Sequence, residues 1–174
     1  GKIEQSQNVR LQLRDWKEIV SMKFSDDAYP EINVSESKRD WGILFHTAMS
    51  KIYDKSQINL AVNFLLKKGM CAETDAQSLL QKIENMFDLK DLGQFFGNQL
   101  KALNEPELIN EEGKMLRPDR VVFFEGYTAI LDYKTGGENE KYDEQLRSYM
   151  RFFKSFSNLP VKAFIVYLEE GKLE

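Results

Sequence analysis

The sequence contains a single cysteine, Cys71, among its 174 residues, and no apolar run as long as the ~18 residues of a membrane-spanning helix. One cysteine excludes a disulfide framework within the chain and a zinc or iron–sulfur site held by four cysteines. The N-terminus has no signal-peptide pattern, so we expect a cytoplasmic protein without membrane contact. The chain begins at Gly1 rather than Met, which we interpret as a fragment of a longer protein rather than as ordinary processing.

Positive charge is also scarce, because 24 lysines and arginines against 28 aspartates and glutamates give a net charge of −4. Nucleic-acid binding rests largely on neutralised phosphates, so an acidic chain binds nucleic acid weakly in general. Any contact with DNA must be local, metal-assisted or helped by a neighbouring domain. The hydrophobic content of 42% is ample for the core of one domain of this length.

The first part of the chain has helical patterning. Residues 1–39 are predicted to form a polar lead-in and an exposed loop, and residues 40–174 to form the folded domain. From Asp40 onward, apolar residues recur at i, i+3, i+4 and i+7, which predicts a helix. Further helices are predicted over 57–68, 75–87 and 92–103, the first of these ended by Gly69 and the last by Pro106.

The second part alternates between strand and helix patterns. Strands are predicted over 107–110, 121–124, 127–131 and 161–168, with a helix over 141–156 before the last of them. A helix between two strands is typical of a crossover connection onto a mixed sheet. The sequence therefore predicts an α/β fold, in which a helical N-terminal half precedes a core with the order α-β-β-β-α-β.

Two carboxylates are predicted to meet in the central hairpin. Glu125-Gly126 separates the two apolar runs as a two-residue hairpin loop does. In such a hairpin residue i faces residue 251 − i, so Asp119 faces Asp132 at close range. Lys134 shares the face of Asp132 because side chains alternate along a strand. Two carboxylates and one ammonium on a single patch suit a divalent cation with oxygen ligands.

Four motifs occur in order along the chain: Gly42-x-x-x-His46 on a helix, Arg117-Pro118-Asp119-Arg120 at a strand end, Asp132-Tyr133-Lys134-Thr135-Gly136, and Gln145-x-x-x-Tyr149 on the following helix. Together they resemble the PD-(D/E)xK nuclease superfamily. More closely, they resemble the RecB-type nuclease domain at the C-terminus of RecB/AddA-like helicase–nucleases. The resemblance covers about residues 40–170 and implies a restriction-endonuclease-like core.

The resemblance also assigns roles to individual residues. It implies a Mg²⁺-dependent deoxyribonuclease in which Asp119, Asp132 and Lys134 are catalytic. The implied metal ligands are His46, Asp119, Asp132 and the Tyr133 carbonyl, and the imidazole would make Mn²⁺ a good substitute. Residues that would contact the substrate or support these ligands are Glu105, Arg117, Gln145 and Tyr149. For the acidic residue before the first core strand, Glu105 and Glu107 remain alternatives, with Glu105 slightly favoured.

The wider function follows from the same resemblance. It implies an exonuclease of double-strand-break repair and recombination that acts on single-stranded DNA. That DNA would be supplied by helicase domains of the same polypeptide, and a second helicase–nuclease subunit could take part. Because Cys71 stands alone, the iron–sulfur subgroup is excluded.

Two other functions compete with this one. The nuclease fold could serve as an inactive DNA-binding or structural module, or residues 40–103 could form a helical protein–protein adaptor. The intact set of His46, Asp119, Asp132 and Lys134 argues against the inactive module. From the residues alone, we expect Arg120 to be a surface charge and Tyr149 to pack in the core.

Overall fold

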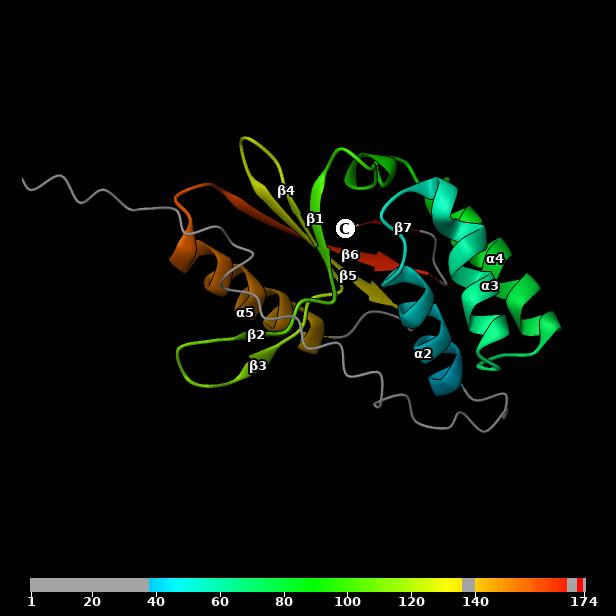
Figure 1. Ribbon diagram of the computed structural model, residues 1–174. Helices are drawn as coiled ribbons and strands as arrows, with labels where there is room; N and C mark the ends of the chain where they lie inside the picture. The colour runs from blue at the N-terminus through cyan, green and yellow to red at the C-terminus, as the bar shows by residue number, and fades with distance from the viewer. Residues whose placement is uncertain (1–37, 136–139, 169–171, 174) are drawn as a thin grey trace, which may run out of the picture. The chain divides into compact units, whose positions relative to one another are not determined.

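The computed structural model describes residues 38–135, 140–168 and 172–173, which form a mixed sheet, a two-stranded ribbon and helices (Figure 1). Residues 1–37 of the predicted lead-in and Gly136 of the third motif lie outside the described residues. The first described helix begins at Lys38, two residues before the predicted start of the domain. In the described part of the chain, no helix has the length and apolarity needed to cross a bilayer.

Three helices follow the predicted pattern closely. They are α2 (Lys38–Met49), α3 (Ile58–Lys67), which follows the short 3-10 helix η1 (Lys55–Gln57), and α4 (Glu73–Phe87). The apolar stripe of α2 is buried through Phe45, Ala48 and Met49, as its spacing predicts. Gly69 has a φ of +68°, a left-handed conformation that glycine adopts without cost, and it ends the α3 segment as predicted.

The predicted helix over 92–103 is wrong. The segment forms a short 3-10 helix, η2 (Gly93–Phe95), and then strand β1 (Lys101–Asn104). An apolar run of this length is compatible with either pattern, and Gly93 and Gly97 weaken a helix. Tertiary pairing decides the outcome, because β1 aligns antiparallel with β4 (Arg120–Phe123) over four residue pairs.

The sheet has the strand order β1-β4-β5-β6-β7, with β5 (Thr128–Lys134), β6 (Val161–Tyr167) and β7 (Lys172–Leu173). Strands β4 and β5 pair antiparallel with Arg120 opposite Leu131, which confirms the predicted register. Strands β5 and β6 run parallel and are joined by the predicted crossover helix α5 (Glu140–Phe156). The predicted strand at 107–110 is β2 (Leu108–Ile109), which pairs with β3 (Met115–Leu116) in a separate ribbon.

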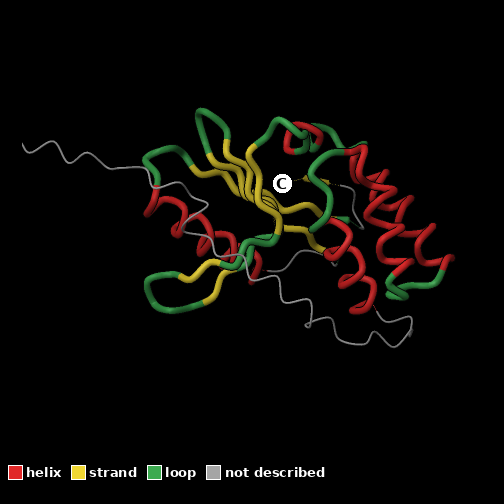
Figure 2. Tube along the Cα trace, viewed as in Figure 1, coloured by secondary structure: helices red, strands yellow, loops and turns green. Residues whose placement is uncertain are grey.

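Helices cover both faces of this sheet, α2, α3 and α4 on one side and α5 on the other (Figure 2). Alternate residues of β5 contribute to the two cores: Leu131 and Tyr133 pack with the three helices, and Ile130 packs with Tyr149 and Phe153 of α5. Burial of β5 on both faces explains its nearly continuous apolar run. The mixed α/β architecture agrees with the predicted restriction-endonuclease-like fold.

Candidate metal centre and active site

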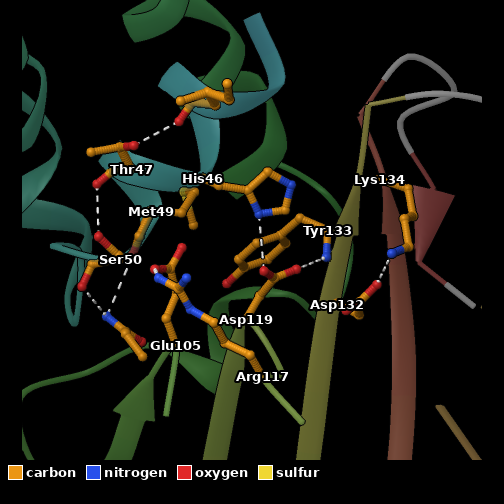
Figure 3. A network of polar contacts seen from close by, with 12 residues as sticks. His46, Thr47, Met49, Ser50, Glu105, Arg117, Asp119, Asp132, Tyr133 and Lys134 are labelled. Carbon is orange, nitrogen blue, oxygen red and sulfur yellow. Dashed lines mark hydrogen bonds and ion pairs between the residues drawn. The ribbon is translucent and has the colours of Figure 1, made fainter. Parts of the chain in front are cut away.

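Asp119 lies one residue before β4, and its carboxylate is held by two partners. The β4–β5 pairing stops at Arg120, so the N–H of Tyr133 has no backbone acceptor on β4. The Asp119 Oδ2 accepts this N–H at 2.6 Å, and its Oδ1 lies 2.9 Å from His46 Nδ1 (Figure 3). The carboxylate thus fixes the end of β5 and meets the imidazole of α2.

His46 reaches Asp119 because α2 packs its apolar stripe on the sheet and turns the next residue toward the strand ends. Burial alone lowers the pKa of His46, but the hydrogen bond to Asp119 and the negative charges of Asp119, Glu105 and Asp132 raise it by more, so the net shift is upward. Gly42, one turn earlier, lies against Thr135, where an added Cβ would be 3.4 Å from the Thr135 Oγ1. An alanine here would make an ordinary van der Waals contact, so α2 passes close to the residue that follows β5.

Glu105 completes a group of three possible metal ligands. One donor atom each from His46, Glu105 and Asp119 lies within 4.8 Å of the others. Glu105 follows β1 with a φ of +46°, an unfavourable conformation for a side chain of this size. Its N–H donates to the Asp119 carbonyl at 2.9 Å, and its carboxylate forms an ion pair with Arg117. Glu107, the alternative acidic residue, is exposed and lies outside this group.

Asp132 and Lys134 form an ion pair on the α5 side of β5. The Asp132 side chain is 3% exposed. This burial, together with the negative charge of Asp119, raises the pKa of Asp132 to about 6, although Lys134 offsets part of the effect. Asp132 is therefore mainly ionised at neutral pH.

Of the three residues predicted to share one patch, Asp132 and Lys134 contact each other, and Asp119 has other partners. Figure 3 shows the Asp119 carboxylate pointing toward His46 and the Tyr133 amide, and the Asp132 carboxylate pointing toward Lys134. Asp119 precedes the pleated part of β4, so strand alternation does not set its direction. Tyr133 joins the site through its N–H, and its predicted carbonyl ligation stays a prediction.

Three hydrogen bonds connect Lys134, through the last motif, to the backbone of Arg117. The Lys134 Nζ donates to Gln145 Oε1 at 3.0 Å, Gln145 Nε2 donates to the Tyr149 hydroxyl at 2.6 Å, and that hydroxyl donates to the Arg117 carbonyl at 3.1 Å. The Lys134 ammonium also lies 4.4 Å from the ring centroid of Tyr142, a cation–π contact. Gln145 and Tyr149 therefore position Lys134, and Tyr149 is buried in the core as expected.

Arg120, expected at the surface, is instead fully buried. Its guanidinium donates to the carbonyls of Ile52, Tyr53 and Phe95 and to Asn104 Oδ1, at 2.6–3.4 Å. These partners are neutral, and the guanidinium also stacks over the Phe96 ring at 4.2 Å. No local pattern marks this role, because the acceptors come from three separate segments of the chain.

Asn104 lies opposite Arg120 in the β1–β4 pairing. Like Arg120, it binds carbonyls of the segment that directly follows α2. Its Nδ2 donates to the carbonyls of Ser50 at 2.9 Å and Ile52 at 3.2 Å. Glu105 directly follows Asn104 and Asp119 directly precedes Arg120. The pair of half-buried Asn104 and buried Arg120 thus fixes α2, which carries His46, against the two strands that carry the acidic candidate ligands.

Comparison with known proteins agrees with this geometry. No curated protein matches the chain. The sequence profile of the PD-(D/E)XK nuclease superfamily matches residues 22–174, a range that contains all four motifs. The profile match, the mixed α/β fold and the His–Glu–Asp group lead to one conclusion: the chain belongs to the PD-(D/E)XK nuclease superfamily.

Proposed function

We propose that this chain is a Mg²⁺-dependent deoxyribonuclease domain of the RecB type. The observation that carries the proposal is the convergence of His46, Glu105 and Asp119 from α2, the end of β1 and the start of β4. Residues distant in sequence bring one imidazole and two carboxylates together within 4.8 Å of one another. Members of this superfamily are typically nucleases that use divalent metals.

The donor set fits a divalent cation of the Mg²⁺ or Mn²⁺ type. Carboxylate oxygens suit Mg²⁺, and the imidazole nitrogen favours Mn²⁺ as a substitute. His46, Glu105 and Asp119 would hold the ion, with Asp132 and the Tyr133 carbonyl as the further ligands inferred from the motif. When bound, such a cation supplies Lewis-acid stabilisation of the charge on a phosphodiester.

We assign to Lys134 the contacts with the attacking water and with the phosphate. Its ammonium is held by Asp132, Gln145 and the Tyr142 ring, so its position is restricted before substrate arrives. There it would offset the negative charge of a phosphate oxygen and orient or help deprotonate the attacking water. Arg117, which is exposed and paired with Glu105, would contact a neighbouring phosphate.

The wider setting is part of the same proposal. We infer a cytoplasmic exonuclease within a RecB/AddA-like helicase–nuclease of DNA repair and recombination, of which residues 40–174 are the nuclease domain. Helicase domains would deliver single-stranded DNA, and a second subunit would complete the assembly. The net charge of −4 gives the isolated domain little attraction for DNA, so we expect slow cleavage without these partners.

Cleavage of end-labelled single-stranded DNA in Mg²⁺, Mn²⁺ or excess EDTA tests the proposal. We expect metal-dependent products from the parent and from Asp88→Asn, a control at an exposed carboxylate, and a collapse of activity for Asp119→Asn. A closed circular single strand should resist cleavage if the enzyme is an exonuclease. Equal cleavage in EDTA would contradict the metal role. If the parent binds DNA without cleaving it, the inactive module is favoured. If the parent neither binds nor cleaves DNA, the adaptor is favoured.

A further inference from the structure

A pocket of about 440 Å³ lies between the β2–β3 ribbon and the N-terminal half of α5, beside the proposed site. On the ribbon side, it is bounded by Lys114, Met115 and Arg117. Gln145 and Ser148 are part of its α5 wall. Figure 1 shows β3 and α5 next to each other.

The charge of this pocket is opposite to that of the whole chain. Among the described residues that line it, the charged ones are the cations Lys114, Arg117 and Lys141 and the acid Glu144, whereas the chain carries −4. Arg117 already pairs with Glu105, so the pocket shares one cation with the metal-ligand group. A local concentration of cations on an acidic chain fits an anionic ligand with phosphates.

The pocket is also joined to Lys134 by hydrogen bonds. Gln145 and Tyr149 line it, and they form the chain of hydrogen bonds from the Lys134 ammonium to the Arg117 carbonyl. A group in the pocket therefore lies next to the residues that position the lysine. Met115, which is 61% exposed, and Leu116 add an apolar surface against which a nucleobase can pack.

We propose that this pocket binds one nucleotide of a single-stranded DNA substrate, next to the phosphodiester that is cut. Its volume is near the low end of the roughly 300–1,000 Å³ of small-ligand pockets, which suits one nucleotide and excludes a duplex. The cations contact the flanking phosphates, the apolar surface of Met115 and Leu116 contacts the base, and the Glu144 carboxylate accepts from a ring N–H on the Watson–Crick edge of the base, such as the N3–H of thymine. In paired DNA that ring N–H is occupied, so the site selects an unpaired strand. This inference rests on the proposed nuclease function for the meaning of the neighbouring phosphodiester.

Filling the pocket without changing its charge is the direct test. Ser148→Phe adds a ring at the pocket wall, and Ser155→Phe adds the same ring on an exposed position of the same helix outside it. Both serines donate to a carbonyl of the preceding turn, and Ser148 also accepts from Arg151 Nη2 at 3.3 Å, so Ser148→Phe loses one exposed hydrogen bond more than its control. Binding of fluorescein-labelled oligothymidylate is measured by anisotropy in EDTA, with an unlabelled duplex as competitor.

We expect Ser148→Phe to weaken oligothymidylate binding about tenfold and to raise KM more than it lowers kcat, with Ser155→Phe like the parent. The duplex should compete weakly. Unchanged binding by Ser148→Phe, an equal loss in Ser155→Phe, or no measurable binding by the parent would overturn the proposal. Hydrolysis of bis(4-nitrophenyl) phosphate by the parent, which needs no nucleotide in the pocket, tests the nuclease function separately. If the parent does not hydrolyse this compound but Ser148→Phe still binds oligothymidylate more weakly than Ser155→Phe, the nuclease function is refuted and the pocket proposal is supported.

Discussion

Asp132→Asn should change how the stability of the protein depends on pH. Burial and the charge of Asp119 raise the pKa of Asp132 from 3.8 to about 6, in spite of the ion pair with Lys134. A carboxyl group with a raised pKa in the folded state binds its proton more tightly there than in the unfolded chain. Its contribution to stability is therefore fully present below pH 3.8 and is lost as the pH rises through about 6.

The size of the effect follows from the shift. A change of about two pKa units corresponds to roughly 3 kcal/mol between the two protonation states, at about 1.4 kcal/mol per unit. Asparagine has the shape of the neutral acid and does not ionise. The free energy of unfolding of Asp132→Asn minus that of the parent should therefore rise by up to about 3 kcal/mol between pH 4 and pH 7. Asp132→Asn also removes the ion-pair partner of Lys134. This loss shifts the difference in the free energy of unfolding by a similar amount at every pH, so it affects the pH dependence less.

Urea denaturation in EDTA at several pH values between 4 and 8 measures this difference without bound metal. Asp88→Asn is the matched control, because Asp88 also faces a lysine, Lys55, but its side chain is 74% exposed. An exposed ion pair contributes roughly 0–1 kcal/mol, so Asp88→Asn should change the free energy of unfolding only slightly. If the parent gains stability over Asp132→Asn as the pH rises, the ion pair with Lys134 dominates burial and the reasoning is wrong. Loss of the fold in Asp132→Asn would make Asp132 a structural residue.

Three further predictions concern single residues. Arg120→Met should destabilise the protein by several kcal/mol in urea denaturation, because it leaves buried carbonyls without donors; a loss below about 1 kcal/mol would show that the buried guanidinium is dispensable. Lys134→Ala should keep Mn²⁺ binding in calorimetry and lose ~10²–10⁴-fold in cleavage rate, whereas equal losses of both would make Lys134 part of the metal site. Glu105→Gln should weaken Mn²⁺ binding and Glu107→Gln should not, and the reverse result would exchange their roles.

Local patterns predicted the parts of the fold that local chemistry determines. The Glu125-Gly126 turn and its flanking apolar runs specified the β4–β5 register, and the stripe on α5 specified the crossover helix. Strand β1 was missed because its short apolar pattern fits a helix as well as a strand, and its identity depends on pairing with β4. Strand β7, at Lys172–Leu173, was not predicted either, and two residues carry too little pattern to show it.

The site was predicted in composition more than in geometry. The motifs identified His46, Asp119, Asp132 and Lys134, but the direction of the Asp119 carboxylate depends on an unpaired N–H at the end of β5. The place of Glu105 in the group depends on the left-handed backbone bend after β1, which no sequence pattern specifies. The burial of Arg120 likewise depends on carbonyls that only the folded chain brings together.

The most direct test of the metal centre is a crystal of the protein soaked in Mn²⁺ and measured for anomalous scattering. The account predicts a peak among the side chains of His46, Glu105 and Asp119, and loss of that peak in Asp119→Asn crystals treated in the same way. A peak elsewhere with no signal among these three residues, or a peak that persists unchanged in Asp119→Asn, would contradict it.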